Sequence, residues 1–506
     1  MFYLDQKATV FIIKNSQTLE TLVIIVFLKN FKKSEKKMAD KIAVVILAAG
    51  KGTRMNLETP KPLVPLCGKT MIDFSLMCAD SACHNLNLDA HYKVITGYGK
   101  EEVESYLLKT DKKNIEFVWQ KEQRGTGDAV KSYTDQVKNL NDYTHTVVMC
   151  ADTPLLKSEY LMKLIEKSLT TNSDAVVATF KVDQPAGYGR IVEKGSAFSI
   201  IEQKDASEEQ KKINEVNSGL YCFKTSYLKE FINTLSSNNA SGEFYLTDLF
   251  QPERNVHKEC FDDALSFQGV NDLVQLESSA LELYRRKTEM LQLSGVRFID
   301  SKTNYIDWDV EIGAGSLIYP SVAIEGKTKI AKSCTIERGS IVKNTILSQN
   351  VVIRSYTVIE SSKIGEGSQI GPFARIRPET ILAKKVKIGN FVETKKAQLE
   401  DGVSVSHLSY LGDAEIGENT NIGCGFITCN YDGESKHLTK IGKNCFIGSD
   451  TQAIAPIEIG DSAYVGSGST LNQNVPSGAF AIARGKQATK EGMAKRFLKG
   501  KYNPNK

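Results

Sequence analysis

The feature that most constrains the fold is a six-residue repeat in the second half of the chain. An aliphatic residue recurs at every sixth position, with small or polar residues between, in three registers separated by phase slips. Neither an α-helix nor a series of β-hairpins has this period. It predicts a left-handed parallel β-helix of hexapeptide repeats, in which each repeat forms one face of a triangular coil. The recurring positions are Ile312, Ile318, Ile324, Ile330, Ile336 and Val342; then Ile346, Val352, Val358, Ile364, Ile370, Ile376, Leu382 and Ile388; and last Ile441, Ile447, Ala453, Ile459, Val465 and Leu471.

Two segments interrupt the repeat and carry polar and charged residues that a coil does not need. They cover residues 394–414 and 424–440. A solenoid coil is stabilised by contacts with the coils above and below it, and these residues are not needed for that. We therefore expect both segments to form loops that leave the coil.

The first half of the chain alternates apolar strands with helices. Strands are predicted at 43–47, 92–96, 115–119, 146–150 and 175–180, with helices at 127–137 and 159–169 among them. Continuous apolar strands separated by helices indicate a Rossmann-like α/β domain with a mostly parallel sheet covered on both faces. Ligands of such sheets bind at the carboxyl ends of the strands.

A single helix is predicted between the two halves, over residues 272–293. Its leucines and Ala280 form one apolar stripe, and Gly295 is a plausible stop. We divide the chain into an N-terminal extension (1–40), an α/β domain (41–271), a linker helix (272–295), a β-helix domain (296–485) and a basic tail (486–506).

The N-terminal extension matches no membrane span and no signal peptide. Its apolar run, residues 22–28, is far shorter than the roughly 20 residues that a span requires. No small-residue cleavage site follows it. We favour a start assigned upstream of the true one at Met38; a short amphipathic anchor or a disordered segment is the alternative.

Composition places the rest of the chain among soluble globular proteins. The apolar fraction is 41% and the charged fraction 25%, and the net charge of +4 gives no reason to expect nucleic acid as a partner. The ten cysteines include no C-x-x-C pair. Reduced thiols in a cytoplasmic protein are the simplest interpretation.

A glycine-containing segment follows the first predicted strand. Residues 47–55 read Leu-Ala-Ala-Gly-Lys-Gly-Thr-Arg-Met. The two glycines let backbone N–H groups approach an oxyanion, and Lys51 and Arg54 supply positive charge. The spacing matches neither the dinucleotide fingerprint nor the P-loop, so hydride transfer and P-loop hydrolysis are disfavoured.

This segment, with Thr-Pro-Lys-Pro-Leu at 59–63, resembles the opening of sugar-1-phosphate nucleotidyltransferases. Residues 120–127, 187–191, 201–205, 216–219 and 269–271 continue the resemblance in order. With the hexapeptide repeats behind it, the chain resembles the bifunctional N-acetylglucosamine-1-phosphate uridylyltransferase/glucosamine-1-phosphate N-acetyltransferase family from about residue 42 to 494.

The resemblance implies a uridylyl-transfer site in the first half. Lys61 and Arg54 are its candidate catalytic residues, and Asp152 and Asn271 would hold Mg²⁺, an ion that prefers carboxylate and carbonyl oxygens. Ala151 stands where the family usually has glycine, from which we expect a slight rearrangement without loss of binding. The candidate substrate-binding residues are Leu47, Ala48, Ala49, Gly50 and Lys61 for the phosphates, Gln120, Gly125 and Thr126 for the uracil, Gly189, Glu202 and Asn217 for the amino sugar, and Cys150, Ala151, Asp152 and Asn271 around the metal.

The resemblance also implies an acetyl-transfer site in the second half, carried by residues 371–378, 390–396, 407–413 and 430–433. His407 is the candidate general base, because histidine accepts a proton near neutral pH without a large shift; the alternative is a histidine satisfied within a loop. The sugar phosphate would be bound by Arg377, Lys395, Tyr410 and Asn421, and acetyl-CoA by Cys424, Asn430, Tyr431, Ser449, Ser467 and Arg484.

Taken together, the resemblance implies an enzyme of UDP-N-acetylglucosamine synthesis that feeds peptidoglycan and lipopolysaccharide precursors. It would acetylate glucosamine 1-phosphate with acetyl-CoA, and then transfer uridylyl from UTP to N-acetylglucosamine 1-phosphate. Two alternatives stay open: a monofunctional nucleotidyltransferase with a structural β-helix, and a non-catalytic regulatory subunit. We expect a homotrimer, with the basic tail either folded over a neighbour's CoA phosphates or solvated.

Overall fold

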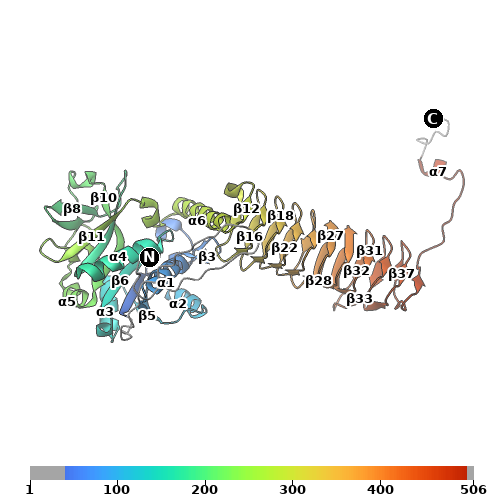
Figure 1. Cartoon of the computed structure of the whole chain (residues 1–506), viewed down its shortest axis with the longest axis horizontal. Coiled ribbons are helices and arrows are strands. Elements are labelled where there is room, and N and C mark those ends of the chain that lie inside the picture. The colour runs from blue at the N-terminus through green and yellow to red at the C-terminus, as the bar shows by residue number, and fades with distance from the viewer. Residues whose placement is uncertain (1–39, 499–506) are drawn as a thin grey trace, which may run out of the picture.

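The computed structural model describes residues 40–498. Figure 1 shows an α/β domain at one end and a straight stack of β-coils at the other, with helix α6 (Leu273–Leu293) beside their junction. None of the helices in the described residues has the length and apolar character needed to cross a membrane. The interpretations of residues 1–39 lie outside the described residues.

The α/β domain is built on a mostly parallel sheet, as predicted. The strand order is β11-β7-β10-β6-β1-β4-β5, and only β10 runs antiparallel to its neighbours in this row. All five predicted strands are present within a few residues of the predicted ends. The strands are β1 (Lys41–Leu47), β4 (Asp89–Thr96), β5 (Ile115–Trp119), β6 (His145–Cys150), β7 (Ala175–Lys181), β10 (Glu215–Lys224) and β11 (Val256–Phe261).

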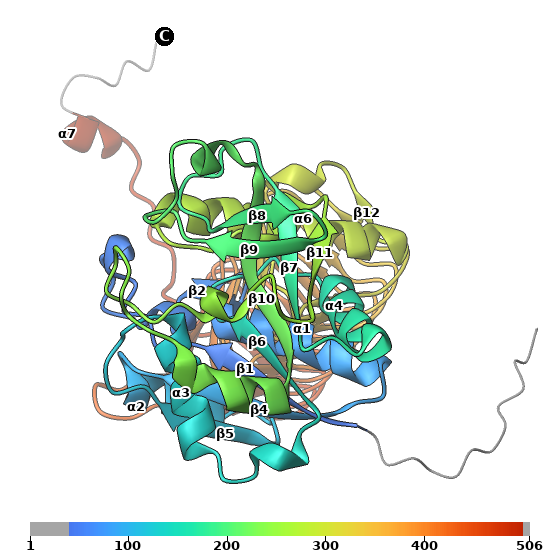
Figure 2. The same ribbon diagram turned by 90° about the vertical axis from the view of Figure 1, so that its left-hand side faces the viewer.

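Helices cover both faces of this sheet (Figure 2). One face packs against α1 (Met71–Asn85), α2 (Lys100–Leu108) and α4 (Ser158–Thr171), and the other against α3 (Thr126–Gln136) and α5 (Thr225–Phe231). Both faces of β1 are therefore buried, which explains its unbroken run of aliphatic residues.

A helix is present where one was predicted between the two halves, and it packs against the α/β domain. Leu283 on α6 is only 2% exposed and shares a core cluster with Phe74, Leu155 and Val270. The first coil touches the same domain: the Trp308 N–H donates to the Cys67 carbonyl (3.0 Å), and the Trp308 ring meets that of Phe74 edge-on.

The second half is the predicted parallel β-helix, running from β12 (Arg297–Phe298) to β39 (Phe480–Ala481). Each strand pairs in parallel with a strand of the next coil, as with Ile318 beside Ile336. A continuous column of buried aliphatic side chains fills the interior. The first and third predicted registers are confirmed, because all of their residues are buried.

The second register is wrong at its first three positions. Leu347, Ile353 and Ile359 point inward, one residue after each predicted position, whereas Ile346 is exposed. Each of these strands carries two adjacent aliphatic residues, and side chains alternate between the faces of a strand. From Ile364 to Ile388 the predicted residues are buried as expected.

One of the two predicted loops is also wrong. Residues 394–414 stay in the coil as β28 (Glu393–Leu399), β29 (Ser404–His407) and β30 (Tyr410–Ile416), because aliphatic and alanine side chains still occupy the inward positions. In the other segment, β32 (Ile427–Cys429) belongs to the coil. Residues 430–438 leave it before β33 (Thr439–Ile441).

Candidate active sites

The predicted phosphate segment lies at the carboxyl ends of three neighbouring strands. Leu47 ends β1, and its carbonyl accepts a hydrogen bond from the Ala151 N–H (3.1 Å), just beyond β6. The Ala48 N–H donates to the Ile95 carbonyl on β4 (3.0 Å). Gly52 has a φ of 64°, and a Cβ there would lie 2.9 Å from Lys61 Cβ. The glycine therefore allows Lys61 to approach the segment closely.

Four predicted residues meet beside this segment. Lys61 Nζ forms an ion pair with Asp152 Oδ2 and donates to Asn271 Oδ1 at 3.2 Å. Arg54 Nη2 also donates to Asn271 Oδ1, at 2.9 Å. The main chain joins the two oxygen-bearing segments, since the Val270 N–H donates to the Asp152 carbonyl at 2.8 Å. Two positively charged side chains and the side-chain oxygens of Asp152 and Asn271 thus lie close together.

The donor set of this cluster fits a magnesium ion. The Asp152 carboxylate and the Asn271 amide oxygen both contact the same ammonium group, so they can reach a common cation. Mg²⁺ is usually held by one or two such oxygens together with substrate phosphates and water. Across residues 40–498, no group of three or more histidine, cysteine, aspartate or glutamate side chains could hold a metal.

The predicted uracil-reading residues lie at the end of β5. The Gln120 side chain is buried, and its Nε2 donates to Asp128 Oδ2 at 2.8 Å and to the Gly125 carbonyl at 3.3 Å. Thr126 Oγ1 accepts from the Leu246 N–H at 3.3 Å. These bonds fix the amide plane of Gln120 and the turn that starts α3, as a rigid reader of a base edge requires.

The predicted sugar-binding residues also lie together. The Asn217 N–H donates to the Gly189 carbonyl at 2.9 Å, and a Cβ on Gly189 would lie 3.3 Å from Glu202 Oε1. Burial raises the pKa of Glu202, which accepts a hydrogen bond from Thr247 Oγ1 at 2.9 Å. Cys150 Sγ lies near Gly219, two residues from Asn217. Cys150 is thus a neighbour of the sugar residues, while Ala151 is buried.

In the β-helix, His407 ends β29 on the exposed side of the coil. Its Nδ1 lies 3.2 Å from Asn390 Oδ1 on the preceding coil, at the end of β27 (Lys387–Asn390). An amide oxygen can only accept, so Nδ1 carries the proton in this contact. The Nε2 lone pair is then available to take a proton from a substrate.

A cluster of basic side chains lies on the coils next to the one that carries the histidine. Lys436, on the loop of residues 430–438, lies beside Lys395 on β28, and their proximity, together with desolvation, lowers the pKa of Lys395. Arg377 also faces Lys395 and is paired with Glu393 at 2.8 Å. Neighbouring ammonium groups repel unless an anion lies between them, so this cluster is suited to a phosphate.

Two more predicted residues meet over a glycine in the next coil. A Cβ on Gly412 would lie 2.4 Å from the Tyr410 hydroxyl and 2.7 Å from Asn430 Nδ2. Gly412 pairs with Lys395 across β28 and β30, which places Tyr410 and Asn430 beside the basic cluster. Asn430 is held by its bond to Asp413 Oδ2, at 2.6 Å.

Four of the predicted acetyl-CoA residues form a column along successive coils. The Asp450 N–H donates to the Cys424 carbonyl, the Gly468 N–H to the Ser449 carbonyl, and Arg484 Nη1 to the Ser467 carbonyl (2.8 Å). The column starts beside the histidine, because the Gly425 N–H donates to the Leu408 carbonyl.

Two predicted residues lie apart from these groups. Asn421 is exposed on β31 (Asn421–Ile422), on the same face as His407 but opposite the far end of β29. The Tyr431 hydroxyl donates to the Gly433 carbonyl within the loop. The structure therefore does not bring Asn421 into contact with Lys395 or Tyr410 in the described chain.

Both halves of the chain match models of known protein families. A family model described as nucleotidyl transferase matches residues 43–264, and one described as bacterial transferase hexapeptide (six repeats) matches residues 438–473. A model described as GMPPB C-terminal domain matches residues 301–399. The nucleotidyl transferase match lies in the α/β domain, and the hexapeptide match lies in the β-helix.

Curated relatives match nearly the whole chain. The bifunctional protein GlmU of Trichlorobacter lovleyi is 41% identical over 89% of this chain and 97% of the relative. The chain belongs to the bifunctional GlmU family. Two further GlmU proteins match to a similar extent. That of Clostridioides difficile is 41% identical over 88% of this chain and 96% of the relative, and that of Listeria monocytogenes is 39% identical over 90% and 99%.

As a GlmU, the chain is a bifunctional enzyme with a uridylyltransferase and an acetyltransferase domain. The monofunctional and non-catalytic alternatives are thereby disfavoured. The roles of single residues remain predictions, which the contacts above support to different degrees.

Two residues that the sequence analysis did not single out contact the residues predicted for acetyl transfer. Lys436 and Asn390 contact Lys395 and His407 only after folding. The quoted segment 390–396 includes Asn390, which stands one 17-residue coil before His407, so coil spacing could have indicated the contact. Lys436 lies on a loop with no periodicity, and we find no sequence signal for it.

Proposed function

We propose that the chain catalyses two consecutive steps of UDP-N-acetylglucosamine synthesis, at sites in separate domains. The observation that carries this proposal is the presence of two anion-binding centres in one chain. One places Lys61 and Arg54 around Asp152 and Asn271, and the other places Lys436 and Arg377 around Lys395 on the β-helix that also carries His407. The product would serve as a precursor for peptidoglycan and lipopolysaccharide.

In the uridylyl-transfer site, the sugar phosphate oxygen attacks the α-phosphorus of UTP, and pyrophosphate leaves. Catalysis of this step depends mainly on positioning and on neutralising charge. Lys61 and Arg54 supply fixed positive charge, and the backbone of residues 47–50 lines the phosphate path. Asp152 and Asn271 would hold Mg²⁺, which supplies further charge neutralisation when bound.

Specificity in this site comes from two sets of residues. Gln120 and Gly125 read the uracil, with Thr126 beside them. Gly189, Glu202 and Asn217 hydrogen-bond the N-acetylated sugar. The raised pKa of Glu202 reflects burial that a bound sugar would increase, and its bond from Thr247 keeps the carboxylate oriented.

In the acetyl-transfer site, the amine of glucosamine 1-phosphate attacks the thioester carbonyl of acetyl-CoA. His407 Nε2 takes the proton that the amine loses, the new amide bond forms as the thioester C–S bond breaks, and the CoA thiolate leaves and receives that proton. Arg377, Lys395 and Lys436 bind the sugar phosphate, with Tyr410 beside them. Cys424, Ser449, Ser467 and Arg484 line the path of CoA along the coils, and Asn430 and Tyr431 contact it from the loop.

The active assembly is proposed to be a homotrimer joined along the β-helix. Two columns of exposed stacked aromatic rings run along the coils: Tyr356, Phe373 and Phe391, with ring centroids 5.3 and 5.6 Å apart, and Phe446, Tyr464 and Phe480. Exposed apolar columns of this kind favour association. A neighbouring copy could bring Asn421 to a shared acetyl-transfer site. Light scattering of the purified chain would test the trimer.

Mass spectrometry of the products separates the two activities. The wild-type chain is supplied with glucosamine 1-phosphate, acetyl-CoA, UTP and Mg²⁺, and should yield UDP-N-acetylglucosamine, CoA and pyrophosphate. His407→Ala should stop acetylation, with a loss of about 10²–10⁴-fold, while uridylyl transfer to added N-acetylglucosamine 1-phosphate continues. Asp152→Asn should give the opposite result. Loss of both activities in either variant would contradict two independent sites.

A further inference from the structure

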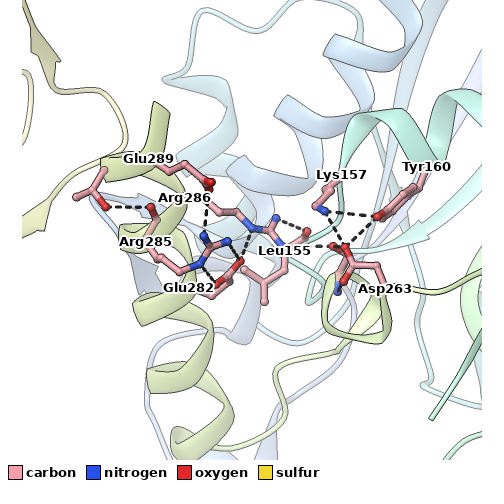
Figure 3. A network of polar contacts seen from close by, with 10 residues as sticks. Leu155, Lys157, Tyr160, Asp263, Glu282, Arg285, Arg286 and Glu289 are labelled. Carbon is pink, nitrogen blue, oxygen red and sulfur yellow. Dashed lines mark hydrogen bonds and ion pairs between the residues drawn. The ribbon is translucent and has the colours of Figure 1, made fainter. Parts of the chain in front are cut away.

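A network of polar contacts surrounds the loop that follows Asp152 (Figure 3). Arg286, on α6, lies at its centre with a side chain only 16% exposed. Its Nη1 donates to the Leu155 carbonyl at 2.7 Å, its Nη2 to Ser266 Oγ at 3.3 Å, and its Nε to Glu282 Oε1 at 2.8 Å. One guanidinium therefore connects the linker helix to two segments of the α/β domain.

The same loop is held at a second point. Lys157 Nζ forms an ion pair with Asp263 Oδ2 at 2.7 Å, and the Tyr160 hydroxyl donates to the same oxygen at 2.9 Å. Ser266 Oγ also donates to Asp263, at 2.8 Å, and so connects this group to Arg286. Burial opposes ionisation, but these bonds lower the pKa of Asp263 to about 2. These bonds therefore favour the ionised form of Asp263.

The second metal-facing residue depends on the same helix. The Asn271 N–H donates to Gln275 Oε1 at 2.7 Å in the first turn of α6, and Asp272 caps that turn by accepting from the Gln275 N–H at 2.9 Å. The beginning of α6 thus places Asn271. The middle of α6, through Arg286, holds the loop after Asp152 and the segment around Ser266 that leads to Asn271.

We infer that Arg286 is a positioning residue for the uridylyltransferase metal site, which fixes the spacing between the Asp152 and Asn271 oxygens by tying both segments to α6. This inference rests on the proposed function, in which those two oxygens hold Mg²⁺. Residues that orient metal ligands without touching the metal typically change metal affinity about 10- to 100-fold when replaced.

The chemistry of the side chain explains why arginine is needed here. A planar guanidinium presents its donors in a rigid fork, so it can bond to a carbonyl, a hydroxyl and a carboxylate at once. Lysine would keep the charge but could not hold all three partners in these directions. Arg286→Lys should therefore keep only part of the effect, and Arg286→Met should lose it.

The linker helix also provides a matched control. Arg285 is the adjacent residue and is 58% exposed; among the described residues its side chain bonds only to Glu282, which it shares with Arg286, and to Glu289, all on the same helix. Arg285→Met removes the same kind of side chain without touching the loop after Asp152. Acetyl transfer, measured on the same full-length chain, reports whether the β-helix remains intact.

The test measures binding, not turnover. UTP is titrated calorimetrically into the full-length chain with Mg²⁺ and again in EDTA, and the ratio of the two affinities reports the contribution of the metal. We expect Arg286→Met to lower this ratio about tenfold or more, Arg286→Lys to lower it less, and Arg285→Met to leave it unchanged. The affinity in EDTA should stay the same in all three variants.

The outcomes distinguish this inference from the function on which it depends. Asp152→Asn should remove the metal-dependent gain in affinity, and its failure to do so would overturn the metal site itself. If Asp152→Asn behaves as expected but both Arg286 variants keep the wild-type ratio, the positioning role is overturned alone. Variants that melt at lower temperature but keep that ratio when folded would show a purely structural role, which also overturns it.

Discussion

Asn390 orients the imidazole of His407 and should contribute to acetyl transfer, with a smaller effect than the histidine itself. Its Oδ1 lies 3.2 Å from Nδ1, which selects the tautomer with a free Nε2 lone pair. Replacing Asn390 with alanine should lower kcat for acetyl transfer about tenfold, within the roughly 10²–10⁴-fold effect of a general base. Steady-state kinetics of CoA release measure this loss.

Uridylyl transfer by the same Asn390→Ala chain is the internal control, because its site lies in the other domain. It should proceed at the wild-type rate. An unchanged kcat for acetylation would contradict the orienting role, whereas a change in the KM for acetyl-CoA alone would point to a binding role.

Lys436 should control both the affinity and the pH dependence of sugar-phosphate binding. Its contact with Lys395, followed by desolvation, lowers the pKa of Lys395, so that side chain loses its charge at a lower pH than an ordinary lysine. The KM for glucosamine 1-phosphate should therefore rise as the pH increases through that lowered pKa. Lys436→Met should raise KM at neutral pH about tenfold, as expected for one lost bond to a charged group.

The same Lys436→Met substitution should also move the pH-dependent rise in KM to higher pH. Without the neighbouring ammonium, the pKa of Lys395 returns toward its ordinary value, and the charge is retained further into the alkaline range. Measurement of KM across alkaline pH tests this shift. A rise at the same pH in both proteins would mean that Lys395 does not titrate there.

At the residue scale, sequence motifs predicted the residues that meet at the uridylyl-transfer site but only some of those at the acetyl-transfer site. Lys61, Asp152 and Asn271 were placed from short motifs, and folding brings them together at the carboxyl ends of parallel strands. Lys436 could not be found in this way, because nothing local to a loop of polar residues shows which coil it will fold against. Its role follows from its proximity to Lys395 alone.

At the scale of elements, the hexapeptide period predicted the β-helix but not every inward side chain. Where two aliphatic residues are adjacent, as in Ile346 and Leu347, the period alone cannot choose between them. In the folded coil, side chains alternate between the two faces of each strand, and the turn before Leu347 is short. Together these features turn Leu347 inward and leave Ile346 exposed. Polarity was misleading over 394–414, because exposed polar residues are compatible with a coil whose interior is still aliphatic.

Asp432 is an internal anchor of the loop of residues 430–438. Asp432 accepts from the N–H groups of Ser435 (2.7 Å) and Glu434 (2.8 Å) and contacts His437 at 2.6 Å, and these bonds hold the pKa of Asp432 below its usual range. Asp432→Ala should loosen the loop and move Lys436 away from Lys395. We expect the KM for glucosamine 1-phosphate to rise several-fold, with about the tenfold effect of Lys436→Met as an upper limit.

Glu434 offers a matched control for that experiment. It lies on the same loop, is exposed, and its carboxylate accepts no hydrogen bond from the described residues. Glu434→Ala should leave the KM unchanged when measured under the same conditions. Equal effects of the two substitutions would show that loop charge, and not the anchor, controls binding.

At the scale of the whole molecule, the two halves are joined by more than a linker. Helix α6 contributes Leu283 to a core cluster of the α/β domain, and the hairpin that follows Lys61 is bonded to the first coil through Cys67 and Trp308. The sequence predicted the helix and its apolar stripe, but a stripe does not show which neighbour will cover it. A domain boundary at residue 271 therefore stays a prediction, and it has a direct test.

The test compares two fragments of the chain with the full-length protein. Fragment 40–325 keeps α6 and the first coils, and should transfer uridylyl at nearly the full-length rate. Fragment 40–271 lacks Leu283 and Arg286, which leaves an apolar groove open and the loop after Asp152 without its anchor. We expect its activity to fall at least about tenfold, as for the loss of a residue that orients metal ligands. Full activity of fragment 40–271 would show that the α/β domain positions its metal site without the helix, and would place the functional boundary at the start of α6.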